Sequence, residues 1–443
     1  MLKSDFRLIG LRVLDDVLER GKRLQESIEE RITVAEDGFK EISKVYELCF
    51  GILREKTNID YFISFYIQKP PKDITLQNIL RIGFYQLNYM DSIPDYAAIH
   101  SAVETAKAAG LTGKSGFVNG VLRNIARDAG KIREIRIDDR LENLAVRYSF
   151  PKWMVALIEK AYGDNNMDKI LSAGNERAPL FLRANTLKTN ADSLAKQLLV
   201  ENVETINAGV VNALIVTAGD VFKTTAYEQG LFYAQDISSQ MFATLVAAKA
   251  GDNIIDVGSA PGGKASYYAA DMKGQGTITA VEFDETRLAS MLQNFRRLGV
   301  ENVVISRVDA AVEKGEYENT ADKVTVDAPC SALGTVRRHP EKKWLIKQED
   351  LKKYPELQLK ILNNVKKWVK QGGELYYSTC TINPGENQEV VEKFLAENEE
   401  FELVNITKNA GLKEEYSHGN YFLSLPGNSL KADGFFAAKL IKK

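Results

Sequence analysis

The sequence predicts a doubly wound α/β domain in the C-terminal part of the chain, preceded by an all-α domain and a small mixed α+β segment. From about residue 236, short apolar β-rich runs alternate with helical stretches, which is typical of a parallel sheet covered by helices. Before about residue 130, apolar residues recur at three- and four-residue spacing, as at Leu8, Leu11 and Leu14, which indicates amphipathic helices. We therefore expect an all-α domain at 1–140, a mixed segment at 141–235 and the α/β domain at 236–443.

Length and composition agree with several folded domains. The 443 residues exceed the roughly 250–300 that one hydrophobic core organises. The content of 44% hydrophobic and 27% charged residues is that of a soluble globular protein. No apolar run approaches the roughly 20 residues of a membrane-spanning helix, and the first residues lack the apolar core of a signal peptide, so we expect a cytoplasmic protein. Cys49, Cys330 and Cys380 are too scattered for a disulfide framework or a zinc site, so we expect thiols and no metal.

Individual elements can be predicted in the mixed segment and the C-terminal domain. A strand is expected around Arg183 in the run FLRANTL, and a helix at Ala191–Leu199. Another helix is expected at Glu285–Leu298, since Asp284 is a suitable N-cap and Gly299 suits the position after the last turn. The strands of the C-terminal domain are expected at Asn253–Val257, Thr277–Phe283, Val303–Ser306, Lys323–Val326 and Glu374–Ser378.

A glycine-rich loop follows the first of these strands. Its residues are Gly258, Ser259, Ala260, Pro261, Gly262, Gly263 and Lys264. Glycines let the backbone approach a ligand closely, and the start of a following helix attracts polar groups, so the loop predicts a nucleotide-type site. A dinucleotide would favour GxGxxG, a spacing that this loop lacks. A nucleoside triphosphate fits GxxxxGK, but Ala265 replaces the hydroxyl residue that would hold magnesium, and Pro261 removes one N–H group.

Acidic residues after the next two strands favour a third ligand, S-adenosylmethionine, which needs ribose and adenine recognition. Glu282 ends the second strand, about 20 residues beyond the loop, where a carboxylate can accept hydrogen bonds from ribose hydroxyls. Asp309 follows the third strand, where it can meet the adenine. Either carboxylate alone is more often an ordinary exposed residue, but their positions at successive strand ends indicate a joint role. We therefore expect S-adenosylmethionine as the cofactor.

Two cysteines follow two further strands, in the runs Asp327-Ala-Pro-Cys330 and Ser378-Thr-Cys380. The carboxyl edge of an open α/β sheet lines its ligand crevice. Carbon 5 of cytosine becomes nucleophilic when a thiolate adds to carbon 6, whereas methylation of an exocyclic amine needs no thiol. Asp327 is placed to hold the pyrimidine edge and to help protonate N3. These residues predict methylation of cytosine at carbon 5 and leave open which cysteine attacks.

Three motifs resemble those of the RsmB/NSun family of RNA cytosine-5 methyltransferases, namely SAPGGK, DAPCSALGTVRRHPEKKW and STCTINPGENQEVV. The runs IPDYAAIHSAVETAK and GFVNGVLRNI resemble the NusB-like helical domain that sets the RsmB group apart within the family. The resemblance covers nearly the whole chain. It implies a Rossmann-like S-adenosylmethionine methyltransferase domain, a NusB-like RNA-binding domain, and small-subunit ribosomal RNA as the substrate, with cytosine 967 of 16S ribosomal RNA as the family target.

The resemblance also implies roles for single residues. Cys380 would be the nucleophile, Cys330 would assist product release, and Asp327 would serve both catalysis and cofactor binding. The other cofactor contacts would be Gly258–Lys264, Glu282 and Asp309. The chain departs from the family pattern at three places, Gly258-Ser259 for Cys-Ala, Ala265 for Thr, and Glu282 for Asp. Because none of these carries the chemistry, we expect cofactor affinity to be tuned and not lost.

RNA binding must rely on local basic patches, because the formal net charge is −2. The candidates for phosphate contacts are Arg127, Lys131, Arg133, Arg136, Arg183, Arg337 and Arg338. His339 lies beside the last two and is a further candidate, whereas His100 and His418 are expected to be structural. We expect a monomer whose RNA binding weakens with salt. There are two rival hypotheses. One is a P-loop NTPase. The other is a non-enzymatic RNA-binding factor, and this second hypothesis would give no function to the loop or to the two thiols.

Overall fold

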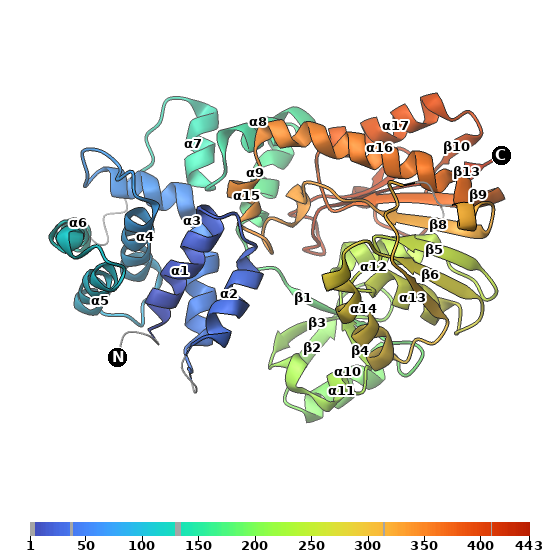
Figure 1. Cartoon of the computed structure of the whole chain (residues 1–443), viewed down its shortest axis with the longest axis horizontal. Helices are drawn as coiled ribbons and strands as arrows, with labels where there is room; N and C mark the ends of the chain where they lie inside the picture. Colours follow the sequence, from blue (N-terminus) through green and yellow to red (C-terminus); the bar gives the residue numbers. More distant parts are fainter. Residues whose placement is uncertain (1–4, 36–38, 129–133, 313–314, 409) are drawn as a thin grey trace. The chain divides into compact units, whose positions relative to one another are not determined.

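The computed structural model describes residues 5–35, 39–128, 134–312, 315–408 and 410–443 (Figure 1). The chain forms two compact units. Unit 1 comprises Met1–Glu176 and Val336–Gln348, and unit 2 comprises Arg177–Thr335 and Glu349–Lys443. The boundary therefore lies inside the segment expected at 141–235. In addition, residues 336–348, which were expected in the α/β domain, belong to unit 1.

Unit 1 is helical, and its helices between residues 6 and 127 share one apolar core. Leu8, Leu11 and Leu14, whose spacing predicts the first helix, are all buried in it. The side chain of Asp73 caps the fourth helix by accepting a hydrogen bond from N of Leu76. The helices are α1 (Phe6–Leu18), α2 (Leu24–Thr33), α3 (Ile42–Ser64), α4 (Ile74–Tyr89), α5 (Asp95–Ala108), α6 (Ser115–Arg127), α7 (Arg140–Arg147), α8 (Lys152–Tyr162), α9 (Asp164–Ala173) and α15 (Lys342–Leu345).

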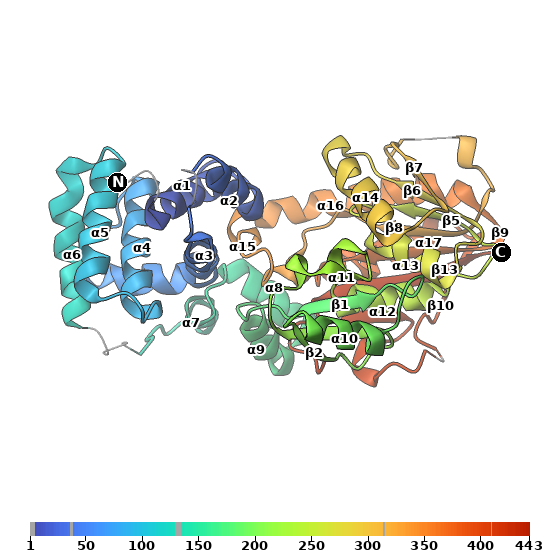
Figure 2. The same cartoon turned by 90° about the horizontal axis from the view of Figure 1, so that it is seen from below.

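A buried lysine explains why residues 336–348 belong to unit 1. Lys343 of α15 donates hydrogen bonds to the carbonyl oxygens of Arg54 (2.9 Å) and Ser149 (2.7 Å) and to Oδ1 of Asn175 (2.8 Å). These three acceptors take the three hydrogens of the ammonium group. Burial lowers the pKa of Lys343 to about 7. Beside it, Nε1 of Trp344 donates to the Leu53 carbonyl at 2.7 Å, and α15 lies next to α3 in both views (Figures 1 and 2).

Unit 2 begins with a small antiparallel sheet. Its strands are β1 (Leu180–Ala184), β2 (Glu204–Asn207), β3 (Ala213–Ala218) and β4 (Phe232–Ala234), in the order β2-β3-β1-β4. Helices α10 (Ala191–Val200) and α11 (Thr225–Glu228) accompany it. Leu182 and Leu194 are fully buried in the core between this sheet and α10. The predicted strand around Arg183 and the predicted helix at Ala191–Leu199 are therefore confirmed.

The remaining strands of unit 2 form one mixed sheet. The order within the described residues is β11-β12-β13-β9-β8-β5-β6-β7, with β10 also paired to β13. Strands β5 to β9 are parallel, and β13 runs antiparallel to β9. The strands are β5 (Asn253–Val257), β6 (Thr277–Val281), β7 (Val303–Ser306), β8 (Ala321–Asp327), β9 (Val369–Thr379), β10 (Phe401–Val404), β11 (Ser417–His418), β12 (Tyr421–Ser424) and β13 (Phe435–Lys442).

Helices cover both faces of this sheet, as the alternating pattern predicts. Figure 1 shows α16 and α17 on one face and α12, α13 and α14 on the other. Their bounds are α12 (Ile237–Val246), α13 (Gly263–Asp271), α14 (Glu285–Leu298), α16 (Lys353–Val365) and α17 (Gln388–Glu397). The predicted caps of α14 are also confirmed, since Asp284 accepts a hydrogen bond from N of Thr286 and Gly299 is left-handed. No helix within the described ranges is long and apolar enough to cross a membrane.

Candidate active site

The glycine-rich loop joins β5 to α13, and two glycines give it its shape. Gly258 has φ of 71° and Gly262 has φ of 95°, a region that favours glycine. A Cβ atom at Gly258 would lie 2.5 Å from the carbonyl oxygen of Asp327. The N–H groups of Gly258 and Ser259 donate to the carbonyl of Val281 at 3.0 and 3.1 Å. These two amides therefore do not form a phosphate cradle, which argues against a nucleoside triphosphate.

Glu282 follows β6 and carries a buried carboxylate. Its Oε1 accepts hydrogen bonds from the N–H groups of Phe283 and Asp284, both at 3.0 Å. Its Oε2 lies 3.1 Å from Nη1 of Arg287 but accepts no hydrogen bond from the described residues. An unsatisfied buried carboxylate oxygen is costly, and a ribose hydroxyl would satisfy it. The sequence prediction missed Arg287, whose Nη2 donates to the carbonyl of Ala260 at 2.6 Å and so ties Glu282 to the loop.

Asp309 lies beyond β7, at the same edge of the sheet. Its Oδ1 accepts a hydrogen bond from N of Ala311 at 2.9 Å, which leaves the carboxylate half-buried at the turn. Asn364 of α16 holds this turn, since its Nδ2 donates to the carbonyls of Ala310 (2.8 Å) and Val312 (2.7 Å). The structure therefore places Asp309 and Glu282 at adjacent strand ends, as their spacing predicts.

An ion pair joins the loop to the end of β8. Nζ of Lys264 lies 2.6 Å from Oδ2 of Asp327. Burial alone would lower the pKa of Lys264, but the charge and hydrogen bond of Asp327, with smaller contributions from Asp256 and Cys380, raise it. The ammonium group is therefore retained at neutral pH. It places a positive charge beside both Asp327 and the thiol that follows β9.

The two cysteines that the sequence places after separate strands meet in the structure. Their sulfurs are 3.3 Å apart, too far for a disulfide of about 2.05 Å and close enough for a hydrogen bond. Both side chains are half-buried. The hydrogen bond to Cys380 raises the pKa of Cys330 well above its usual range, and burial adds to the effect. Cys330 therefore holds its proton and can donate it to the sulfur of Cys380.

Sequence reasoning also missed Glu386, a carboxylate close to both cysteines. It is fully buried, and it accepts hydrogen bonds from N and Oγ of Ser331, the residue after Cys330, at 2.8 and 2.5 Å. The only feature of the sequence that could have indicated a function for Glu386 is its position in the run STCTINPGENQEVV. That run does not show which strand-end loop the side chain contacts.

Two of the arginines predicted to contact RNA are buried in the structure. Arg183 is 4% exposed, and its guanidinium donates to Oε1 of Gln235 and the carbonyl of Gly263, both at 2.6 Å, and to Oγ of Ser266 at 2.7 Å. The guanidinium of Arg183 therefore makes its hydrogen bonds inside unit 2. Arg337 is 2% exposed and cannot present its guanidinium to a phosphate in this conformation.

The other predicted RNA contacts differ in their surroundings. Arg338 is half-buried, Arg127 is exposed, and Arg136 lies 3.4 Å from Oε2 of Glu134. Lys131 and Arg133 lie outside the described residues. Arg127, Arg136 and Arg338 stay predictions.

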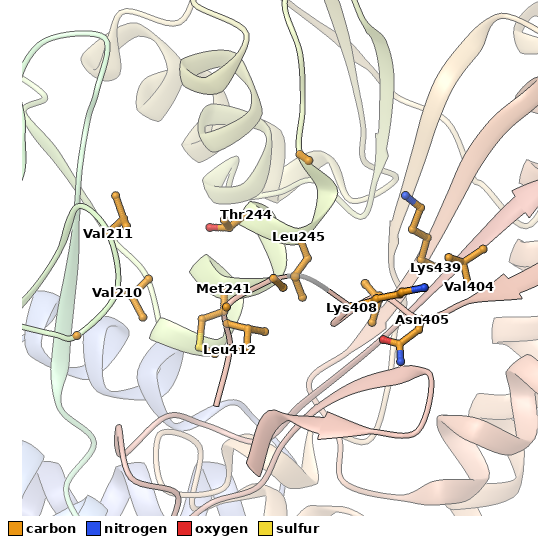
Figure 3. A pocket seen from close by; sticks show the side chains of 15 residues that line it. Val210, Val211, Met241, Thr244, Leu245, Val404, Asn405, Lys408, Leu412 and Lys439 are labelled. Carbon is orange, nitrogen blue, oxygen red and sulfur yellow. The ribbon is translucent and has the colours of Figure 1, made fainter. Parts of the chain in front are cut away.

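A separate pocket of about 550 Å³ lies between the β2–β3 turn, α12 and the segment after β10 (Figure 3). Its lining is largely apolar and includes Val210, Met241, Leu245, Val404, Lys408 and Lys439. None of the residues predicted to bind cofactor or to react lines this pocket, so it is not part of the candidate site. Within the described ranges, no group of three or more His, Cys, Asp or Glu side chains could hold a metal ion.

A mixed sheet with a parallel centre, which carries a glycine-rich loop, carboxylates and two thiols at one edge, is typical of one class of protein, the Rossmann-like methyltransferases. Residues 243–441 match the family described as 16S rRNA methyltransferase RsmB/F. Residues 4–127 match the NusB family, and residues 150–220 match the ferredoxin-like domain of RsmF/B-like methyltransferases.

Whole-chain relatives agree with these matches. The probable ribosomal RNA small subunit methyltransferase B of Bacillus subtilis is 34% identical over 401 residues, which cover 90% of each chain. The ribosomal RNA small subunit methyltransferase B of Shewanella oneidensis is 32% identical over 442 residues, covering 99% of each chain. The crystal structure of PH0851 superposes with a TM-score of 0.82 at 25% identity, covering 98% of this chain and 99% of that one. The chain belongs to the RsmB/F family of 16S rRNA methyltransferases.

Proposed function

We propose that the protein transfers a methyl group from S-adenosylmethionine to carbon 5 of a cytosine in 16S ribosomal RNA. The observation that carries this proposal is the pair of sulfurs of Cys330 and Cys380, 3.3 Å apart beside the cofactor loop. A protonated thiol next to a second thiol suits formation and release of a cysteine–cytosine bond, which methylation of an exocyclic amine does not need. The relatives act on small-subunit ribosomal RNA by name, and the family resemblance adds cytosine 967 as the target.

The residues at the sheet edge fit S-adenosylmethionine. The loop Gly258–Lys264 would pass close to it, Glu282 would accept hydrogen bonds from its ribose through the unsatisfied Oε2, and Asp309 would lie on the adenine side. When bound, S-adenosylmethionine supplies the methyl group as an electrophile on a positively charged sulfur. Lys264 and Asp327, paired at 2.6 Å, would lie beside this cofactor.

The chain's own residues account for the remaining steps. The thiolate of Cys380 bonds to C6 of the cytosine, and the electron pair of the C5–C6 double bond moves to C5, which becomes the methyl acceptor. Negative charge develops at N3 during this addition and N3 takes up a proton from water, so that the carboxylate of Asp327 can accept a hydrogen bond from the N3–H group. Once C5 carries the methyl group, a base takes the proton from C5. The electron pair of that C–H bond re-forms the C5–C6 double bond, and the electron pair of the sulfur–C6 bond leaves with the sulfur of Cys380. Cys330 donates its proton to the departing sulfur of Cys380, and this assists release.

Unit 1 supplies RNA capture in this proposal. Its NusB-like helices carry no chemistry of their own, and Arg127 on α6 is exposed. A cytosine that reacts at C5 and C6 must be unpaired or flipped out of a helix. In this proposal the enzyme is a monomer and acts in the cytoplasm. Its affinity for RNA decreases as the salt concentration rises.

Nucleoside analysis tests the proposal. Small-subunit ribosomal RNA is incubated with S-adenosylmethionine and protein, digested, and examined for 5-methylcytidine by mass spectrometry. We expect 5-methylcytidine with the wild type and with Cys49→Ala, whose thiol is buried in unit 1, and none with Cys380→Ala. Methylation of a different atom, or undiminished methylation by Cys380→Ala, would contradict the proposal.

A further inference from the structure

Glu386 is bonded to the loop that carries Cys330. It ends the short helical turn Pro384–Glu386, which follows Cys380 along the chain, and its side chain is fully buried. Its Oε2 accepts a hydrogen bond from the N–H of Ser331 at 2.8 Å, and its Oε1 accepts one from the hydroxyl of Ser331 at 2.5 Å. Since Ser331 directly follows Cys330, the carboxylate holds that loop at two points.

The same carboxylate is bonded to the loop that carries Cys380. Its Oε1 accepts hydrogen bonds from Nδ2 of Asn383 at 3.0 Å and from Oγ1 of Thr381 at 3.4 Å. The hydroxyls of Thr381 and Ser331 are also 2.8 Å apart. Thr381 follows one cysteine and Ser331 follows the other, so the contacts join the two loops at equivalent positions.

A helix completes the set of donors around Glu386. Nε2 of Gln358 in α16 donates to Oε2 of Glu386 at 3.4 Å and to the carbonyl of Pro329 at 3.0 Å. Loss of the carboxylate would leave several buried donors without an acceptor, which favours rearrangement of the loops. The negative charge of Glu386 also contributes to the raised pKa of Cys330, after the hydrogen bond to Cys380 and burial.

We propose that Glu386 is a positioning residue that keeps the thiol of Cys330 in contact with the sulfur of Cys380. The consequence of this positioning for RNA release rests on the proposed function, in which Cys330 protonates the departing sulfur. When the two loops lose their shared acceptor, the sulfurs separate. Release of the product is then impaired, while binding of the cofactor is retained. Glu282 and Asp309, the proposed cofactor contacts, lie after β6 and β7. Among the described residues, their hydrogen bonds involve neither Glu386 nor the two cysteine loops.

The first test needs no RNA. Diamide takes two electrons and two protons from a pair of thiols: one thiolate adds to it, and the second thiol then displaces it and leaves a disulfide. With diamide in excess, so that the first addition is fast, the rate of disulfide formation reports how often the sulfurs of Cys330 and Cys380 meet. We expect Glu386→Ala to slow formation of this disulfide by about 10-fold or more, because a displacement near 1 Å costs orders of magnitude in such proximity-controlled reactions. Glu389→Ala, which removes an exposed carboxylate three residues further on, should leave the rate unchanged.

The second test follows the covalent RNA complex by denaturing gel with unmodified ribosomal RNA. If the proposed function holds, Cys330→Ala accumulates an adduct on Cys380. Glu386→Ala should accumulate the same adduct while binding S-adenosylmethionine with wild-type affinity by calorimetry. The double variant should accumulate no more than Cys330→Ala, because both changes remove one function. Absence of any adduct from Cys330→Ala would count against the proposed function alone.

Ser331→Ala is a milder variant for the case that Glu386→Ala does not fold. It removes one hydroxyl donor and keeps the carboxylate, so we expect a smaller decrease in the disulfide rate and partial accumulation of adduct. The inference is overturned if a folded Glu386→Ala, or Ser331→Ala in its place, forms the disulfide at the wild-type rate and releases RNA normally.

Discussion

Lys264 is the residue that connects the cofactor loop with the reacting groups. It pairs with Asp327 at 2.6 Å, and the negative charge of a Cys380 thiolate would also be stabilised by its ammonium group. We expect Lys264→Met to lower kcat/KM by roughly 10- to 100-fold, the effect of losing a charged hydrogen bond. The measurement is transfer of labelled methyl groups to ribosomal RNA. Lys249→Met, at an exposed lysine before β5, is the control, and equal activities would contradict this role.

The pKa of Cys330 has a direct chemical consequence at the same scale. Because the hydrogen bond to Cys380 and burial raise this pKa above the ordinary 9.0, the thiolate of Cys330 forms only at higher pH. Alkylation of Cys330 by iodoacetamide, mapped by mass spectrometry, should therefore stay slow through pH 9. Since the largest cause is the hydrogen bond, Cys380→Ala should move the onset of alkylation to lower pH. An onset in the wild type at or below pH 9 would be inconsistent with the geometry of the pair.

At the scale of elements, Arg183 attaches the small sheet to α13. Its guanidinium connects β1 with the first turn of that helix through Gly263 and Ser266. We expect Arg183→Met to lower the free energy of unfolding by about 2–4 kcal/mol, because buried acceptors lose a charged donor. Urea unfolding measures this loss. If Arg183→Met were as stable as the wild type but bound RNA with a weaker salt dependence, the original prediction of an RNA contact would be restored.

Elements whose cause is local could be predicted from the sequence. The bounds of α14 follow from Asp284 and Gly299, whose effects act within one helical turn. The parallel strands follow from short apolar runs, and the loop and carboxylates follow from their positions at strand ends. The function of Arg183 could not be predicted, because a strand-end arginine in sequence looks the same whether its partners are phosphates or a buried helix turn. Glu386 was missed for the same reason, since Ser331 approaches it only after folding.

At the scale of the whole molecule, the division into two units does not follow the order of the chain. Residues 336–348 belong to unit 1 although their neighbours along the chain belong to unit 2. Lysine side chains are almost always exposed, yet Lys343 is fully buried. This contradiction arises because three oxygens, of Arg54, Ser149 and Asn175, replace water around the ammonium group.

Replacement of Lys343 tests this arrangement. Lys343→Met leaves three buried acceptors without donors, so we expect the free energy of unfolding of unit 1 to fall by about 2–4 kcal/mol. Hydrogen exchange should become faster around Arg54 and Ser149, while binding of S-adenosylmethionine by unit 2 is unchanged. Lys342→Met, at the preceding and half-buried lysine, is the control. An unchanged rate of hydrogen exchange in unit 1 would show that the segment 336–348 does not stabilise this unit.

The central claim is that Cys380 bonds to a cytosine of ribosomal RNA while Cys330 stands beside it. Covalent trapping tests this claim most directly: the protein and S-adenosylmethionine are incubated with ribosomal RNA that carries 5-fluorocytosine, and the modified peptide is identified by mass spectrometry. Fluorine at carbon 5 prevents the final loss of a proton, so the sulfur–C6 bond persists. We predict an adduct on Cys380 in the wild type and in Cys330→Ala. An adduct on Cys330, or none on either cysteine with cofactor bound, would contradict the account.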